Sequence, residues 1–354
     1  MEEEYLKGRG AQKNIPNKFF KASYSKDFIE GIDEWEIEKN KTQFTIVYPK
    51  SIVNKVTSPD VGMEYSLNPY QGCEHGCIYC YARNSHQYWG LSAGLDFETK
   101  IMVKNNAPKL FREFLSKKNW DGSTISLSGN TDCYQPLERK FKLTESLLKI
   151  ALEFNQPVSI ITKNSLIIRD LEILKQLSKR NLCVVYISIN SLREDVRLKL
   201  EPRTVTAKQR LKVIETLTNN GIPVGIMCAP IIPGLTEHEI PKIVEAASKA
   251  GAKWAGFTIV RLNGEISKIF TDWLYKAYPE RATKIINSIQ SCHDGNLNDS
   301  QFGNRMKGTG KVAEIISDNF KLHCKVHKIN TSRYNLDSKK FNNNLNRQLN
   351  LFNS

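Results

Sequence analysis

The stretch NPYQGCEHGCIYCYAR, residues 68–83, brings three thiols together in a C-x3-C-x2-C spacing. Short spacers separate Cys73, Cys77 and Cys80, and glycines among them relax the backbone. Three thiolates so close in sequence can converge on one metal centre. The spacing therefore predicts a metal site with these three cysteines as its ligands.

The number of ligands limits the kind of metal site. A closed structural zinc site takes four protein ligands, so the fourth would have to be His75 or a distant residue such as Cys133. An iron–sulfur cube is normally held by four cysteines, and three would leave one iron without a protein ligand. An open position is typical of a catalytic metal site, so the count favours a centre that binds something further.

From about residue 120 onward, apolar β-branched runs alternate with amphipathic helical patterns. Runs that are apolar on both faces are typical of buried strands in a parallel sheet. With residues 66–73 as a first strand, the pattern predicts an α/β fold, a partial (β/α)6 barrel with its chemistry at the C-terminal strand ends. The other strand-like runs cover residues 124–130, 157–164, 182–190, 223–233 and 254–261, and the helical patterns cover 143–154, 168–180, 206–220 and 237–250.

The regions that flank this alternation differ from it in composition. The pattern predicts an N-terminal extension, the barrel core, a C-terminal region with one helix, and a flexible Asn-rich basic tail. A strand or hairpin is expected within the extension, from the apolar residues of 34–50. The four parts cover residues 1–57, 58–290, 291–335 and 336–354.

Charge and composition limit the range of functions that the sequence allows. The formal net charge is +14, which favours a polyanionic partner, with nucleic acid first. No apolar run is long enough to span a membrane, and the acidic N-terminus has no apolar leader. We therefore expect a cytoplasmic protein with reduced cysteines that serve metal binding or catalysis.

The cysteine spacing at the end of a first strand, followed by βα units, resembles the radical S-adenosylmethionine (radical SAM) superfamily. The resemblance implies a 4Fe-4S cluster held by Cys73, Cys77 and Cys80. It also implies that the open iron binds the amino and carboxylate groups of S-adenosylmethionine. An electron from an external donor then cleaves the sulfonium to a 5′-deoxyadenosyl radical. Tyr79 matches an aromatic position near the adenine.

Further motifs narrow the resemblance to a subgroup related to spore photoproduct lyase, whose members are often labelled DNA repair photolyase-like. The similarity runs from about residue 58 to 310 and includes an N-terminal KGRGA and a C-terminal QLNLF. Its motifs after the cysteines are GLDFETKI (94–101), SGNTDCYQPLE (128–138), ITKNSLIIRDLEIL (161–174), LEPRT (200–204) and APIIPGLTEHEI (229–240). The subgroup's own substrate does not follow from them.

The resemblance places polar residues where superfamily members bind the methionyl group. Asn130, Thr131 and Asp132 offer acceptors that suit the methionyl ammonium. Lys163 matches a lysine that pairs with the methionyl carboxylate. A structural alternative stays open for Asp132, which could cap a turn.

Further along the chain, Ser188 and Asn190 end a strand and could reach the ribose hydroxyls, or simply end that strand. Arg203 offers a planar fork to a carboxylate or a substrate phosphate, or could neutralise nearby Glu201. His75 is expected to brace the cysteine loop rather than bind iron.

A hydrogen-atom donor is harder to place. Spore photoproduct lyase uses a cysteine near the end of this same strand, but Gly129 occupies about that place here. The neighbouring Cys133 and Tyr134 are therefore the candidates for a radical relay.

The leading hypothesis is a radical SAM enzyme that acts on nucleic acid, with a DNA lesion as its substrate and lyase-like chemistry. The alternatives are a radical SAM enzyme that modifies RNA or a protein, and a zinc-binding adaptor without enzyme activity. The tail supports DNA, because QLNLF resembles the peptide by which repair proteins dock on the bacterial DNA sliding clamp. The predicted clamp contacts are Gln348, Leu349, Leu351 and Phe352.

Overall fold

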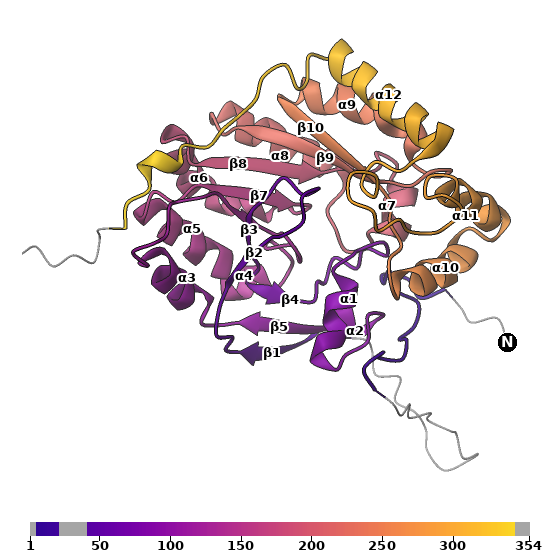
Figure 1. The fold of residues 1–354 in the computed structure, drawn as a ribbon, viewed down its shortest axis with the longest axis horizontal. Coiled ribbons are helices and arrows are strands. Elements are labelled where there is room, and N and C mark those ends of the chain that lie inside the picture. Colours follow the sequence, from indigo (N-terminus) through magenta and orange to yellow (C-terminus); the bar gives the residue numbers. More distant parts are fainter. Residues whose placement is uncertain (1–4, 21–40, 344–354) are drawn as a thin grey trace, which may run out of the picture.

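The computed structural model describes residues 5–20 and 41–343. Its centre is a curved sheet whose strand order is β10-β9-β8-β7-β6-β3-β2 (Figure 1). All neighbours are parallel except β2 and β3, which form an antiparallel pair at one edge. The strands are β2 (Val53–Lys55), β3 (Tyr65–Leu67), β6 (Ile125–Leu127), β7 (Val158–Thr162), β8 (Cys183–Ser188), β9 (Val224–Ile231) and β10 (Trp254–Ile259).

The six parallel strands confirm the predicted α/β partial barrel. Five of these strands lie within the predicted apolar runs, because burial on both faces selects for such residues. The first strand, predicted at 66–73, instead divides into β3 (Tyr65–Leu67) in this sheet and β4 (Tyr70–Gln71) in a second sheet. The register aligns Leu67 with Leu127, Leu127 with Ile160, and Ile160 with Val185. Since the strands run in one direction, their C-terminal ends open on one edge of the sheet, where the polar motifs lie.

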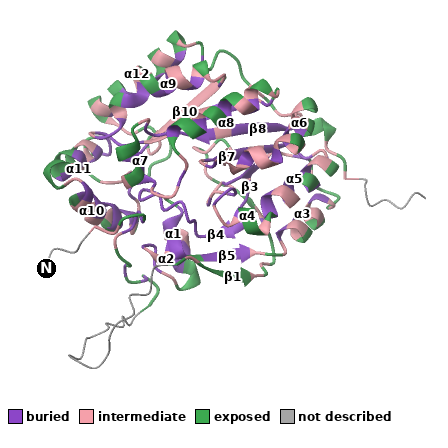
Figure 2. Cartoon of the chain, turned by 180° about the vertical axis from the view of Figure 1, so that it is seen from behind, coloured by how far each residue is buried: buried purple, intermediate pink, exposed green. Residues whose placement is uncertain are grey.

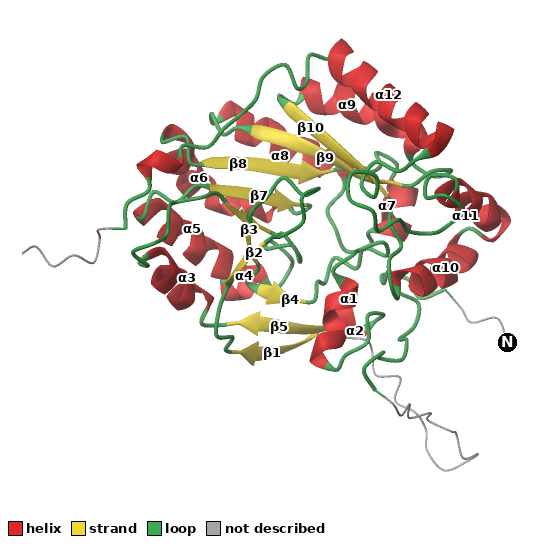
Figure 3. Cartoon of the chain, in the orientation of Figure 1, coloured by secondary structure: helices red, strands yellow, loops and turns green. Residues whose placement is uncertain are grey.

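Helices cover the outer face of this sheet (Figure 3). Two sequence signals fix the ends of one of them: the Thr206 hydroxyl accepts the Gln209 N–H at 3.2 Å, and Gly221 beyond the last turn has φ of 73°. The helices from this layer are α3 (Ala107–Leu115), α5 (Leu143–Glu153), α6 (Leu171–Lys179), α8 (Ala207–Asn219) and α9 (Ile240–Lys249). The remaining helices of the barrel half are α4 (Glu138–Phe141) and α7 (Glu194–Leu200).

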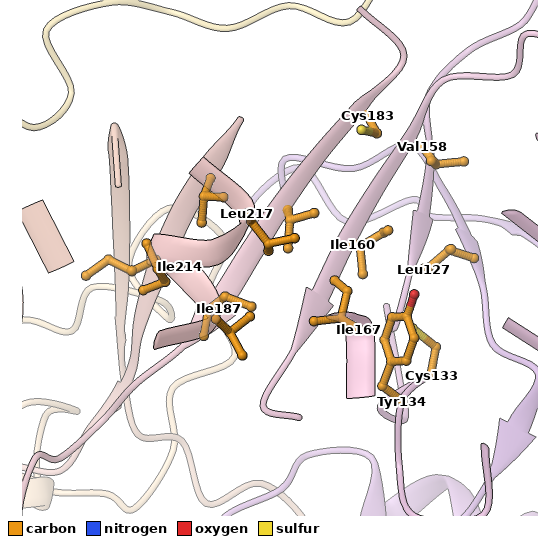
Figure 4. Packing of buried hydrophobic residues seen from close by; sticks show 14 of the residues in the cluster. Leu127, Cys133, Tyr134, Val158, Ile160, Ile167, Cys183, Ile187, Ile214 and Leu217 are labelled. Atoms are coloured by element: carbon orange, nitrogen blue, oxygen red, sulfur yellow. The ribbon is translucent and has the colours of Figure 1, made fainter. Parts of the chain in front are cut away.

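The core lies between the strands and this helical layer. Leu127, Ile160 and Ile187 from the sheet meet Ile167, Ile214 and other apolar side chains, all buried (Figure 4). Burial of an aliphatic side chain of this size contributes about 1.5–3 kcal/mol. The continuous cluster holds the strand ends, and therefore the polar residues beyond them, in fixed positions.

A second, smaller sheet lies beside the larger one (Figure 1). Its order is β1-β5-β4, with β1 (Gln43–Val47) parallel to β5 (Lys100–Lys104) and β4 (Tyr70–Gln71) antiparallel to it. The prediction of a strand within 34–50 is thus confirmed, whereas residues 21–40 lie outside the described chain. The short helices α1 (Arg83–His86) and α2 (Asp96–Thr99) connect β4 to β5, and β1 shows mostly exposed residues (Figure 2).

The C-terminal part adds α10 (Ile266–Ala277), α11 (Ala282–Gln290) and α12 (Gly310–Val326), and α12 packs beside α9 (Figure 1). The prediction of a flexible tail from residue 336 is wrong for 336–343. The Asp337 N–H donates to the Asn181 carbonyl, Asn342 N–H donates to that of Phe154, and the Phe341 ring packs on the core. The clamp-like residues from 344 onward lie outside the described chain.

Among the helices of the described part, none combines the length and the apolar character that a bilayer span requires.

Candidate functional site

The cysteine loop joins β4 to α1 at the C-terminal edge of the barrel. Gly72 and Gly76 have φ of 81° and 68°, a region that glycine adopts without strain. The Cys73 N–H donates to the Phe97 carbonyl at 2.9 Å, and the Ile78 N–H donates to the Leu200 carbonyl at 3.0 Å. The loop is therefore held by backbone contacts from two sides.

The three thiols lie in one electrostatic neighbourhood. Burial raises the pKa of Cys73 well above its usual value, and Asp132, Cys77 and Cys80 raise it further. Burial also raises the pKa of Cys77, to about 12, although Lys163 opposes the shift. A cation bound among them would reverse this, because it stabilises thiolates. As they stand, no three His, Cys, Asp or Glu side chains in the described chain are arranged to hold a metal ion.

Asp132 ties the loop to two strand ends. Its carboxylate accepts the Tyr134 N–H at 2.8 Å, the Lys163 N–H at 2.9 Å and the Thr162 hydroxyl at 2.8 Å. His75 Nδ1 lies 3.3 Å from Oδ2. Burial acts to raise the pKa of Asp132, but His75 and these hydrogen bonds outweigh it and lower the pKa to about 2. The carboxylate thus serves as a brace, the alternative role that the sequence left open.

His75 completes this brace, as expected. Its other ring nitrogen, Nε2, lies 3.2 Å from the Asn164 side-chain nitrogen. The ring is 1% exposed, so it links the cysteine loop to the end of β7 rather than meeting solvent.

A second buried charge cluster lies behind Tyr79. The Tyr79 hydroxyl donates to Glu201, and Arg210 Nη2 donates to the other Glu201 oxygen at 2.5 Å. Burial acts to raise the pKa of Glu201, but Arg210 and Lys163 outweigh it and lower the pKa. Sequence reasoning missed Glu201 and Arg210 as site residues. It also named the wrong partner, because Arg210 rather than Arg203 neutralises Glu201.

Lys163 and Asn190 each carry a polar group that lacks a matching partner in the described chain. The half-buried Lys163 forms no ion pair within the described residues, and its Nζ lies 6.0 Å from the Tyr79 ring centroid. Burial acts to lower its pKa, but Cys77 and Glu201 outweigh it, so the pKa is raised and the ammonium stays charged. Asn190 donates to the Tyr79 hydroxyl at 3.2 Å, while its buried Oδ1 has no partner in the described chain. A ligand carboxylate and a ligand hydroxyl would satisfy these two groups.

The other predicted cofactor contacts lie within the protein, and the side chains of Thr131 and Asn130 have partners there. The Thr131 hydroxyl donates to the Tyr70 carbonyl at 2.7 Å. The Asn130 amide lies 3.3 Å from the Ser85 hydroxyl. Ser188 is buried, and its carbonyl accepts Arg210 Nη1 at 2.8 Å.

Arg203, the last predicted contact, lies at the outer side of the cysteine loop. It pairs with Glu74 at 3.4 Å and contacts the Thr42 hydroxyl at 3.2 Å. Its guanidinium is therefore matched in part by a carboxylate of the loop itself.

The two relay candidates point away from the loop. Cys133 and Tyr134 are both 0% exposed and pack in the main core with Leu127 and Ile160 (Figure 4). The Tyr134 hydroxyl donates to Asp170 at 3.0 Å. A hydrogen donor must touch its substrate, so this placement does not support the radical relay.

An N-terminal segment that sequence reasoning left without a role packs against the cysteine loop. Glu98, fully buried, accepts the Gly10 N–H at 3.1 Å and the Ala11 N–H at 2.8 Å. It also pairs with Arg83 at 2.5 Å, and Arg83 Nε donates to the Cys77 carbonyl at 3.0 Å. Gly10 is the position in the sequence that could have indicated this packing, because a Cβ there would lie 1.8 Å from the Gly76 carbonyl oxygen.

The rim on the open side carries Tyr81 and Arg261. The Tyr81 hydroxyl donates to the Gly129 carbonyl at 2.7 Å, and the residue is 58% exposed. Arg261 follows β10 and contacts only neutral atoms, Asn298 Oδ1 at 3.3 Å and Met306 Sδ at 3.5 Å. Within the described chain Arg261 forms no ion pair. The rim thus offers one exposed ring and one half-buried cation.

Comparisons with known proteins agree with this architecture. The radical SAM superfamily profile matches residues 67–247. An uncharacterized protein of Mycobacterium tuberculosis is 30% identical over 244 residues, covering 68% of this chain and 72% of that protein. A protein of Pseudomonas phage M6 named "Radical SAM Nalpha-GlyT isomerase" is 26% identical over 227 residues, covering 58% and 44%.

Solved structures of spore photoproduct lyase share the fold. One mutant superposes with a TM-score of 0.60 at 14% identity, covering 85% of each chain. The complex with dinucleoside spore photoproduct gives 0.56 at 15% identity, again covering 85% of each chain. From the profile match, the mycobacterial relative and the fold, the chain belongs to the radical SAM superfamily.

Proposed function

We propose that this protein is a radical SAM enzyme that acts on nucleic acid, with a DNA lesion as its preferred substrate. The observation that carries the proposal is the arrangement beside the cysteine loop. Three buried or half-buried thiols adjoin the cation of Lys163 and the unmatched Oδ1 of Asn190.

The family implies S-adenosylmethionine and an iron–sulfur cluster, and the side-chain chemistry of the residues beside the cysteine loop suits both groups. We assign Cys73, Cys77 and Cys80 to a 4Fe-4S cluster, since three soft thiolates leave the fourth iron open. Lys163 suits the methionyl carboxylate and Asn190 a ribose hydroxyl. When bound, the two groups supply a 5′-deoxyadenosyl radical.

The role of the chain itself is to hold and orient these groups. His75 and Asp132 fix one side of the loop, and Arg83 with Glu98 fixes the other. A fixed loop holds the reacting atoms in the orientation that the reaction needs, and this orientation contributes to catalysis.

Three observations support nucleic acid as the substrate. The net charge is +14, a similar fold binds a dinucleoside lesion, and Arg261 at the rim lacks a carboxylate partner in the described chain. A phosphate would supply that partner. Arg261 suits this role better than Arg203, which Glu74 already pairs.

The alternative functions differ from this proposal in their substrate or in their metal. A radical SAM enzyme that modifies RNA or a protein would use the same loop and the same Lys163. Family membership argues against the zinc-binding adaptor, since superfamily members carry an iron–sulfur cluster.

The test is an anaerobic turnover assay with the reduced, cluster-loaded protein and S-adenosylmethionine. Ultraviolet-irradiated DNA, matched undamaged DNA, RNA and a protein mixture are compared for substrate-dependent 5′-deoxyadenosine or for deuterium exchange into it. The proposal expects stimulation by damaged DNA above all others. Stimulation by RNA or protein alone would reassign the substrate, and Cys77→Ala is the background control.

A further inference from the structure

Four large aromatic side chains are exposed together beside the end of α1. Phe19 and Phe20 come from the N-terminal segment, and Tyr88 and Trp89 come from the turn that follows α1. Their exposed fractions are 52%, 61%, 73% and 46%. We call these four residues the aromatic patch. Exposed aromatic rings that gather in this way are typical of a binding surface.

The aromatic patch is built on a fixed base. The Asn17 side chain donates to the Gln87 carbonyl at 2.8 Å and to the Leu91 carbonyl at 3.1 Å, which joins the two segments. The Ile15 N–H donates to the Ser92 hydroxyl at 2.8 Å. Because the backbone beneath is tied on both sides, the four rings are held in place.

The rings already form a cation–π arrangement. The Phe19 and Tyr88 centroids lie 5.1 Å apart, and Lys18 Nζ lies 5.0 Å from the first and 5.7 Å from the second. The segments 5–20 and 81–95 contain five Lys and Arg residues, of which Arg9 and Arg83 are buried, Lys13 pairs with Asp272, and Lys18 lies over the rings. The surface therefore places flat apolar faces beside the cation of Lys18.

The patch also lies close to the site. The short helix α1 leads from Cys80 to Tyr88. At its other end Asn84 donates to the Asn263 carbonyl at 2.9 Å and accepts the Glu265 N–H at 3.1 Å. These contacts fix α1 against the turn after β10, two residues beyond Arg261.

We propose that the aromatic patch binds unpaired bases of the nucleic-acid substrate, with Tyr88 and Phe19 stacking on bases and Lys18 contacting the backbone. Flat rings interleaved with cations suit single-stranded nucleic acid, since every base has a face that stacks. A protein partner is the less fitting occupant, because the four rings and Lys18 offer few directional contacts. The inference rests on the proposed nucleic-acid substrate and adds that the strand is unpaired where it meets the protein.

The test uses the full-length cluster-loaded protein and a short labelled oligothymidylate, with binding measured by fluorescence anisotropy over a range of salt. Tyr88→Ala should weaken binding by about tenfold, whereas Tyr88→Phe, which keeps the ring, should bind as the wild type does. Lys18→Gln should flatten the salt dependence, and Tyr88→Ala should leave the slope unchanged. Tyr275→Ala, which removes an exposed ring on α10 (49% exposed), is the matched control.

The outcomes separate this inference from the proposed function. If the wild type binds the oligonucleotide and Tyr88→Ala binds equally well, the patch proposal fails while the nucleic-acid proposal stands. If damaged DNA drives turnover but the protein binds only duplex DNA, the unpaired-base proposal again fails alone. If the wild type neither binds nor turns over any nucleic acid, both fail. Self-association that Tyr88→Ala abolishes, measured by light scattering, would make the patch a protein interface and overturn the inference.

Discussion

Lys163 carries a charged ammonium into the neighbourhood of Cys77 and Glu201 without an ion pair of its own in the described chain. If its partner is the methionyl carboxylate, Lys163→Ala should weaken S-adenosylmethionine binding by roughly tenfold or more. Anaerobic calorimetry measures this, and the iron content should not change. Lys212→Ala, on the outer surface of α8, is the control. Unchanged affinity in Lys163→Ala would remove the lysine from the cofactor site.

His86 makes a pH-dependent contribution to stability. Burial lowers its pKa from 6.5 to about 4, so the unfolded chain binds the proton more readily between these values. The contribution is complete above pH 6.5 and is lost as the pH falls through about 4, on the order of 3 kcal/mol.

Urea unfolding of the apoprotein across this range measures the effect. His86→Gln should flatten the profile between pH 6.5 and 4, whereas His238→Gln, at an exposed position, should leave it as in the wild type. An equal slope in His86→Gln and the wild type would show that another group carries the dependence.

The sequence alone indicated some residues of the candidate site and missed others. The bracing role of His75 was predicted because it lies within the cysteine loop, whereas the cluster role of Cys73, Cys77 and Cys80 stays a prediction. Glu201 and Arg210 were missed because Tyr79, their link to the site, is 122 residues from Glu201 in sequence. The burial of Cys133 and Tyr134 in the main core could not be predicted either, since the sequence of a turn after a strand does not fix where its side chains point.

The N-terminal segment acts at the scale of elements, because residues 5–20 form part of the wall around the cysteine loop. Gly10→Ala should push this segment off the loop, since its Cβ would lie 1.8 Å from the Gly76 oxygen. A displacement of this kind costs about 1–3 kcal/mol.

We expect Gly10→Ala to lower the melting temperature and the iron content after reconstitution. Gly62→Ala is the matched control, because nothing lies within 4 Å of a Cβ there. Equal iron content and equal melting temperature in the two variants would show that the segment does not support the loop.

The strands and helices of the barrel could be predicted from the periodicity of apolar residues in the sequence. A strand that is buried on both faces needs a continuous apolar run. The small sheet was harder to predict. The strand β4 has only two residues, Tyr70–Gln71, and its partner β5 pairs with β1 in a register that joins residues 57 positions apart, such as Gln43 and Lys100. The docking of 336–343 was missed for a similar reason, since the one apolar anchor, Phe341, stands in a polar stretch.

At the scale of the molecule, the last described residues lie at the N-terminal edge of the sheet. Asn343 contacts the Lys117 carbonyl at 3.5 Å, at the end of α3, away from the cysteine loop. This is compatible with the proposal that Gln348, Leu349, Leu351 and Phe352 bind a sliding clamp.

A peptide of residues 339–354 should bind a bacterial clamp with micromolar affinity, roughly −8 kcal/mol. Substituting both Gln348→Ala and Phe352→Ala should abolish binding in calorimetry, because the amide and the aromatic anchor are lost together. S-adenosylmethionine cleavage by the full-length variant should be unaffected. If the wild-type peptide does not bind, the clamp proposal is rejected and the preference for DNA weakens.

The central claim is that the cysteine loop holds an iron–sulfur cluster that makes the protein a radical SAM enzyme. Its most direct measurement is electron paramagnetic resonance of the anaerobically reduced protein, with and without S-adenosylmethionine, together with assays for iron, sulfide and 5′-deoxyadenosine. We expect a reduced-cluster signal that changes when S-adenosylmethionine binds, and 5′-deoxyadenosine as a product. Cys73→Ala, Cys77→Ala and Cys80→Ala should each lose both, while Cys183→Ala, in the core, keeps them. A colourless wild type that contains zinc, or a cysteine-loop variant with full activity, would contradict the account.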